Sequence, residues 1–146
     1  MDDKSEDRVI DVYRRHGADW AKLRGTRLAE GPWLDRFCAL LPANADILDI
    51  GCGSGMPIAH HLLRRGFQVT GVDAAPEMLA LFHANLPGCP TRLADMRHLA
   101  LGHRFAGLLA WDSFFHLSAD DQRGMFQRFR AHAAPNAALL STSGPA

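Results

Sequence analysis

The spacing of apolar residues along the chain changes near Asp46. Before that residue, apolar positions recur at helical spacing between residues 9 and 13 and again from Trp33 to Leu41. After it, short apolar runs alternate with helical segments, which is typical of a parallel sheet covered on both faces. The pattern divides the chain into an N-terminal helical segment, residues 1–45, and an α/β domain, residues 46–146.

Residues with the properties of helix caps and stops separate the apolar runs. Pro32 suits the first position of a helix whose apolar stripe ends before Pro42, and Gly66 is a stop for a later helix. Ser118, with Asp121 three residues later, resembles the capping box of a last helix. The expected strands are residues 46–50, 67–73, 91–94, 105–111 and 137–141. This alternation predicts a doubly wound α/β fold with a mostly parallel sheet.

The composition is that of a folded protein without a strongly charged binding surface. Sixteen Lys and Arg residues balance sixteen Asp and Glu residues, and 47% of the chain is apolar, so we expect a packed core and no nucleic-acid partner. The N-terminus lacks the apolar stretch of a secretory signal, and no run has the length of a membrane helix. These features predict a cytoplasmic protein with no membrane partner. The three cysteines lack CxxC spacing, and His60 and His61 are adjacent, so we expect no metal site.

A glycine-rich loop joins the first expected strand to the next helix. It contains Gly51, Gly53 and Gly55, which let a ligand approach the backbone closely. The second expected strand ends in Asp73, 22 residues beyond Gly51 by number (73 − 51). A carboxylate at this offset suits the two hydroxyl groups of a ribose. The loop and the acid together predict an adenosine-type ligand.

The spacing of the glycines distinguishes between two such ligands. A dinucleotide-binding fingerprint has its third glycine at the position of Met56, whereas here the third glycine is Gly55. Asp49 places a carboxylate just before the loop, where it would repel a pyrophosphate and attract an ammonium group. The pattern favours S-adenosylmethionine over NAD, and an NAD-dependent oxidoreductase remains the alternative.

These segments resemble those of class I S-adenosylmethionine-dependent methyltransferases, over essentially the whole chain. The most specific part is the run from Ile47 to Gly55, followed by the run from Val69 to Asp73. The resemblance implies that the glycine loop, with Cys52, lies against the methionine part of the cofactor and that Asp73 binds the ribose. It further implies an adenine subsite, where Asp95 accepts from the amino group and the N–H of Met96 donates to the ring. The residues expected beside the adenine are Ala74, Met78 and Leu99.

The acceptor is expected beside the end of the fourth strand, where Trp111 borders the cofactor. Enzymes that methylate nucleic-acid bases or protein glutamine resemble one another in an Asn/Asp-Pro-Pro-Tyr/Phe motif at this place, but this chain has Asp-Ser-Phe-Phe at residues 112–115. The departure favours a small-molecule acceptor. His116 is the candidate base, and the residues expected to shape the acceptor pocket are Tyr13, Trp20, Phe114 and Phe115. Residues 1–45 would form a lid. A binding module without catalytic activity is a further alternative.

The last expected strand, 137–141, is uniformly apolar and comes close to the end of the chain. The family that the chain resembles usually adds a further helix and an antiparallel pair of strands, so we expect these last strands to be missing. Without them the fifth strand forms an apolar edge, and such an edge invites pairing with another molecule. The sequence therefore predicts either a fragment or a homodimer that forms through this edge.

Overall fold

The computed structural model describes residues 31–110 and 118–141. In chain order the elements are α2 (Gly31–Ala39), β1 (Asp46–Ile50), α3 (Ile58–Arg64), β2 (Gln68–Asp73), α4 (Pro76–Asn85), β3 (Thr91–Leu93), the 3-10 helix η1 (Met96–His98), β4 (Phe105–Ala110), α5 (Ala119–Ala131) and β5 (Ala133–Ser141). Helices expected before residue 31 lie outside the described residues. Within the described part of the chain, no helix is long and apolar enough to cross a membrane.

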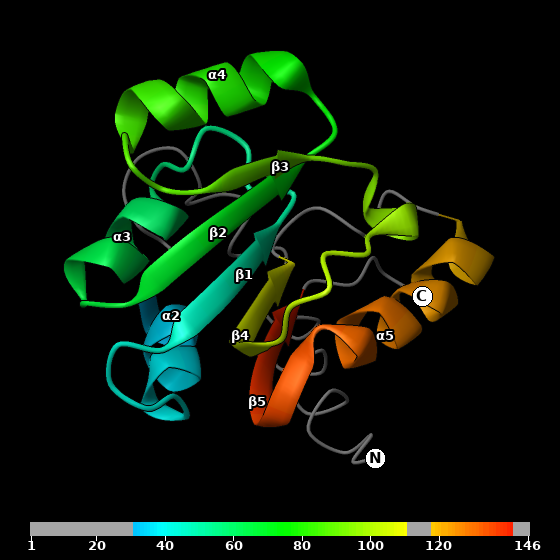
Figure 1. Ribbon diagram of the computed structural model, residues 1–146. Helices are drawn as coiled ribbons and strands as arrows, with labels where there is room; N and C mark the ends of the chain where they lie inside the picture. The colour runs from blue at the N-terminus through cyan, green and yellow to red at the C-terminus, as the bar shows by residue number, and fades with distance from the viewer. Residues whose placement is uncertain (1–30, 111–117, 142–146) are drawn as a thin grey trace.

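The five described strands form one parallel sheet in the order β3-β2-β1-β4-β5. The chain moves outward from β1 through β2 to β3 and then returns to place β4 on the other side of β1 (Figure 1). The order therefore reverses between β1 and β4, as in a doubly wound, Rossmann-like α/β fold. The predicted fold class is confirmed for these residues.

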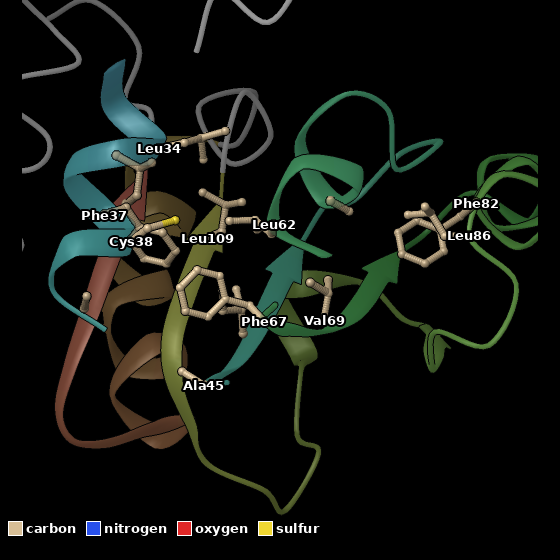
Figure 2. Close-up of a cluster of buried hydrophobic side chains, with 14 residues drawn as sticks. Leu34, Phe37, Cys38, Ala45, Leu62, Phe67, Val69, Phe82, Leu86 and Leu109 are labelled. Atoms are coloured by element: carbon tan, nitrogen blue, oxygen red, sulfur yellow. The ribbon is translucent and has the colours of Figure 1, made fainter. Parts of the chain in front are cut away.

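Alternating side chains of the strands divide the core into two clusters. Ile47 of β1 packs in one cluster with residues of α2, α3 and α4, and Figure 2 shows Leu34, Phe37 and Cys38 of α2 near Leu62 of α3. Leu48, one position further along β1, packs in the other cluster with residues of η1 and α5. This alternation follows from the period of two in a strand. It explains why β1 is apolar at most positions, since both of its faces are covered.

Helix α2 approaches the sheet closely over Gly107 in β4. A Cβ atom at Gly107 would lie 2.9 Å from Cζ of Phe37, 3.2 Å from Cγ1 of Ile47 and 3.2 Å from Cδ1 of Leu41. Phe37 and Ile47 are both buried. The absence of a side chain at Gly107 therefore lets the helix pack directly on the sheet.

The end of α2 differs from the expected stripe. The helix ends at Ala39, and Leu40 is 66% exposed. The N–H of Leu40 donates to the carbonyl of Phe37, and that of Leu41 donates to Cys38. These i to i−3 bonds tighten the last turn. The tighter turn puts Leu40 in solvent while Leu41 still packs against the core.

The expected bounds are accurate at β1 and at the start of β4, and they differ from the structure at β2, β3 and β5. β2 begins at Gln68, β3 ends at Leu93, and β4 is described to Ala110, because Trp111 lies outside the described residues. β5 begins at Ala133, well before residue 137. The added residues include Pro135 and Asn136, which the edge strand accommodates with a shift of register between Phe105 and Gly107 of β4.

We predict that Gly107→Ala destabilises the fold by about 1 to 3 kcal/mol, because the added methyl group overpacks the contact with Phe37. Gly124→Ala is the matched control. A Cβ at Gly124 in α5 would meet nothing within 4 Å, so this change should stabilise the helix by about 0.5 to 1 kcal/mol. Urea unfolding measures the free energy of unfolding of both variants. Equal changes in the two variants would contradict the packing explanation.

Candidate functional site

The predicted ligand-binding residues come together at the carboxyl edge of the sheet. The glycine loop follows β1, Asp73 ends β2, and Asp95 follows β3. In open α/β sheets, ligands bind at this edge, near the point where the strand order reverses. Residues 111–117, which follow β4 and include Trp111, Phe114, Phe115 and His116, lie outside the described residues, as do Tyr13 and Trp20.

The backbone of the glycine loop is strained for any residue with a side chain at each of its three glycines. Gly51, Gly53 and Gly55 all have positive φ, at 74°, 57° and 82°. A Cβ at Gly55 would also lie 2.7 Å from Cδ1 of Leu86 and 2.9 Å from Cδ2 of Phe82. At Gly53, by contrast, a Cβ would meet nothing within 4 Å, so this side of the loop is open to an approaching group.

The carboxylate of Asp73 joins the glycine loop to the turn before α4. Its Oδ2 accepts from the N–H of Gly53 at 2.9 Å, and its Oδ1 accepts from the N–H of Ala75 at 2.9 Å. The N–H groups of Gly51 and Cys52 both donate to the carbonyl of Val72, at 2.7 and 2.9 Å. The structure thus brings the loop and Asp73 into direct contact. Each carboxylate oxygen has a second lone pair, so Asp73 can also accept from hydroxyl groups.

Cys52 packs beneath this junction as a neutral thiol. Burial raises its pKa far above the ordinary value, and the nearby carboxylates of Asp49 and Asp73 raise it further. A thiol without thiolate character is a poor nucleophile. The pKa shift therefore argues against a nucleophilic role for Cys52.

Gly71, in β2, is a residue of the site that the sequence reasoning did not single out. A Cβ there would lie 2.8 Å from Sγ of Cys52 and 2.9 Å from Cζ of Phe82. The glycine therefore provides the space into which the loop and α4 pack. A glycine inside a strand is the sequence signal for such a close approach.

Asp49 is a buried acid at the carboxyl end of β1. It is only 4% exposed. Burial raises its pKa from 3.8 to about 7, and the charge of Asp73 adds to the increase. A buried carboxyl group next to a second negative charge is disfavoured in its ionised form. A cationic group bound beside them would relieve this repulsion, as expected from the sequence.

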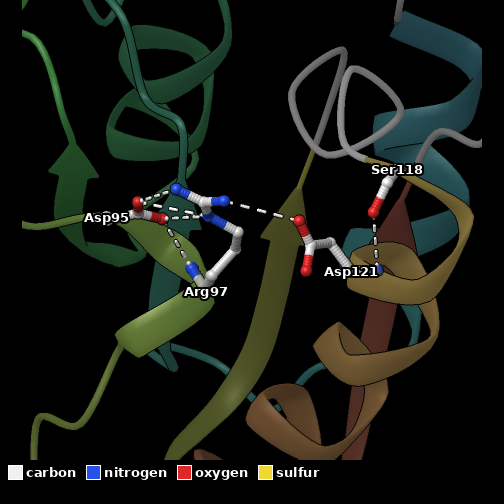
Figure 3. Close-up of polar contacts among 4 residues, drawn as sticks. All are labelled: Asp95, Arg97, Ser118 and Asp121. Atoms are coloured by element: carbon white, nitrogen blue, oxygen red, sulfur yellow. Dashed lines mark hydrogen bonds and ion pairs between the residues drawn. The ribbon is translucent and has the colours of Figure 1, made fainter.

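Asp95 forms a polar network at the start of η1 (Figure 3). Its Oδ1 accepts from the N–H of Arg97 at 2.9 Å, and its Oδ2 lies 2.6 Å from Nη2 of the Arg97 side chain. Hydrogen bonds from Arg97 lower the pKa of Asp95 to about 2. Arg97 also contacts Asp121 of α5 at 3.4 Å. Sequence reasoning missed Arg97. Its contact with Asp95 is local, whereas its contact with Asp121 is set by the tertiary structure.

The start of α5 differs in one respect from the capping box expected from the sequence. Ser118 does cap the helix, since its Oγ accepts from the N–H of Asp121 at 3.1 Å. The carboxylate of Asp121 instead reaches Arg97 (Figure 3). The capping residue was predicted correctly, and the role of its acidic partner was not.

The remaining cofactor candidates differ in exposure. Ala74 is exposed beside Asp73, and Met78 is half-buried in α4. Met96 is half-buried against the cluster under α5, which contains the buried Leu99. Among residues 31–110 and 118–141, no group of three His, Cys, Asp or Glu side chains could hold a metal ion.

Comparison with known proteins identifies related sequences and structures. Residues 47–136 match the family described as a methyltransferase domain. The chain is 31% identical over 101 residues to dTDP-3-amino-3,6-dideoxy-alpha-D-glucopyranose N,N-dimethyltransferase of Streptomyces fradiae. That alignment covers 68% of this chain and 39% of the relative.

Two of the similar solved structures are methyltransferases crystallised with S-adenosylmethionine. CalS10, an amino pentose methyltransferase from Micromonospora echinaspora with S-adenosylmethionine bound, is 29% identical with a TM-score of 0.66, over 82% of this chain and 51% of that one. The glycopeptide N-methyltransferase MtfA, complexed with S-adenosylmethionine, is 25% identical with a TM-score of 0.66, over 74% of this chain and 51% of that one. The chain thus spans about half the length of these solved relatives, and less of the Streptomyces fradiae protein.

We predict that Asp49→Asn raises the melting temperature of the ligand-free protein at about pH 8. Between pH 3.8 and about 7 the folded chain binds a proton at Asp49 that the unfolded chain has lost, so the stability of the wild-type protein falls as pH rises through this window. Asn cannot ionise, so the variant does not lose stability in this pH window. The gain should shrink as the pH is lowered towards 4.

Thermal unfolding over this pH range measures the effect. Asp46→Asn is the matched control, because it makes the same change at the half-exposed start of the same strand. A gain at Asp49 that is independent of pH would contradict the electrostatic explanation.

Proposed function

The chain belongs to the methyltransferase domain family, and from this membership we propose that it transfers a methyl group from S-adenosylmethionine to a small molecule. The relatives named above act on an amino sugar or a glycopeptide, and two of them were solved with S-adenosylmethionine. The matched segment contains the glycine loop, Asp73 and Asp95.

The observation that carries the proposal is the contact between Asp73 and the glycine loop. Because Gly53 and Ala75 fix the two oxygens of Asp73, the carboxylate is already oriented before a ligand binds. In the proposed complex, Asp73 accepts from the ribose hydroxyls and the open side of Gly53 lies against the methionine part. Gly51, Cys52 and Gly55 shape the rest of the loop, and Asp49 faces the ammonium end.

The adenine end of the proposed site lies towards η1. Asp95 accepts from the adenine amino group, and the N–H of Met96 donates to the ring. Ala74, Met78 and Trp111 complete this proposed cofactor site. Asp95 shares its oxygens with Arg97, and this pairing keeps the carboxylate ionised as an acceptor.

The proposed reaction is a single in-line displacement. The bound cofactor supplies an electrophilic methyl group on a sulfonium, so an acceptor atom forms one bond to carbon while the carbon–sulfur bond breaks. The task of the protein is to hold the acceptor in line and exclude water. The negative charges of Asp49 and Asp73 favour binding of a cationic sulfonium compound.

The acceptor side of the proposal rests on the sequence. Phe114, Phe115, Tyr13 and Trp20 would shape the pocket, residues 1–45 would close over it, and His116 would take a proton where the acceptor requires a base. An amino group on a sugar is an acceptor of the kind that the named relatives methylate.

Two other functions were left open by the sequence. An NAD-dependent oxidoreductase is disfavoured because the family match and the named relatives are methyltransferases. A binding module without activity would bind the cofactor but give no product, and only a turnover experiment distinguishes it from an enzyme.

We predict that S-adenosylmethionine and S-adenosylhomocysteine raise the melting temperature and that NAD does not. A ligand at 100 times its dissociation constant adds about 2.7 kcal/mol to stability. Asp73→Asn should weaken binding by about 1 to 3 kcal/mol. Asp35→Asn, an exposed acid of α2, is the control.

Turnover is then tested with methyl-labelled cofactor and a metabolite extract enriched in amino sugars. A labelled small molecule that depends on the protein is the expected product. Binding of NAD without binding of S-adenosylmethionine would overturn the proposed cofactor. Cofactor binding with no labelled product would instead support the binding module.

We also propose that two copies associate through the edge strand β5. In the described sheet, β5 has a neighbour on one side only, and such an edge can pair with another chain. The mass measured by analytical ultracentrifugation should therefore increase from that of a monomer to that of a dimer as the protein concentration rises. A monomer at every concentration would contradict the association.

A further inference from the structure

One side of α5 carries three residues that contact the segment around η1. They are Asp121, Arg128 and His132, the last being the C-cap of the helix. Their spacing of seven and four residues places them on one helix face. Met125 and Phe129, between them, are buried in the core cluster that also contains Leu99. The middle of this helix face is therefore packed in the core, and the three polar residues lie at its edge.

The three contacts lie at successive points of the facing segment. Asp121 pairs with Arg97 of η1 at 3.4 Å. Nη1 of Arg128 donates to the carbonyl of Leu99 at 3.1 Å. The N–H of Leu101 donates to Nε2 of His132 at 3.0 Å. Together these contacts fix residues 97 to 101 along α5.

His132 is the most buried of the three, at 2% exposure. Its Nδ1 lies 2.7 Å from the carbonyl of Arg128, which can only accept, so Nδ1 carries the proton. Its Nε2 accepts from Leu101 and therefore carries none. The two backbone partners thus select one neutral tautomer. Both ring nitrogens are used, so rotation of the ring would break two hydrogen bonds in a site with little access to water.

The segment that His132 holds is continuous with the proposed adenine subsite. Asp95 and Met96 precede the contacts at Arg97, Leu99 and Leu101 directly in sequence. We infer that His132 is a positioning residue for adenine recognition: it anchors the far end of this segment, so that the Asp95 carboxylate and the Met96 N–H stay aligned for hydrogen bonds to the base. The inference rests on the proposed function, because it assumes that an adenine nucleoside occupies this edge.

A positioning role predicts a loss of base discrimination, whereas a purely structural role predicts a loss of stability alone. S-inosylhomocysteine is a suitable probe because it replaces the adenine amino group, a donor to Asp95, with a carbonyl oxygen. A well-aligned acceptor rejects this analogue, since two acceptors would face each other. We expect the wild-type protein to prefer S-adenosylhomocysteine over this analogue by at least about tenfold.

His132→Leu should reduce the preference to within about threefold, because nothing then accepts from Leu101. His132→Gln should restore most of it, since the amide oxygen can take the place of Nε2. Arg104→Met is the matched control. Arg104 donates to the carbonyls of Arg130 and Ala133 at the same end of α5, so its loss should lower stability and leave the preference unchanged.

Calorimetric titration with both ligands measures the preference, and hydrogen exchange at the amide of Leu101 reports the anchor without any ligand. Faster exchange and a reduced preference in His132→Leu, both restored in His132→Gln, support the inference. An unchanged preference, or an equal loss for both ligands, would overturn it. A wild-type protein that binds neither ligand would instead overturn the proposed function, and unchanged exchange at Leu101 would show separately that His132 is no anchor.

Discussion

The carboxylate of Asp73 is the junction on which the candidate site depends. It accepts from Gly53 in the loop after β1 and from Ala75 in the turn before α4, so two connections from neighbouring strands are fixed relative to each other. The junction forms only because Gly71 and Gly55 leave room for Cys52 and Phe82. A side chain at Gly71 would push the loop away from β2, and one at Gly55 would push it away from α4. The close packing that these two glycines permit thus sets the geometry of the polar site.

The same junction has an electrostatic consequence. Burial raises the pKa of Asp49 to about 7, and the nearby charge of Asp73 adds to the increase. The ligand-free site therefore holds the carboxyl group of Asp49 in an environment that disfavours its ionised form. Sites that bind charged ligands commonly contain groups of this kind. A sulfonium and an ammonium group would offset the repulsion, which connects the instability of the empty site to the charge of the proposed ligand.

Helix α5 has a second role besides covering the sheet. Its apolar residues fill the core beneath η1, and its polar residues border that core with contacts to Arg97, Leu99 and Leu101. The segment after β3 has little regular structure of its own, since β3 is short and η1 is a single turn. Side chains of α5 therefore provide the hydrogen bonds that its backbone does not make internally.

The sequence alone determined the elements and the loop. Apolar runs, glycines with special backbone angles and the acid at the end of β2 are local signals, because strand period, left-handed φ and chain offset depend on near neighbours. The tertiary structure decided which groups meet. It extended β5 through Pro135 because an edge strand needs fewer N–H donors. It also paired Arg97 with Asp121, and it buried Asp49 and His132. These outcomes depend on residues that are distant in sequence, so no local pattern encodes them.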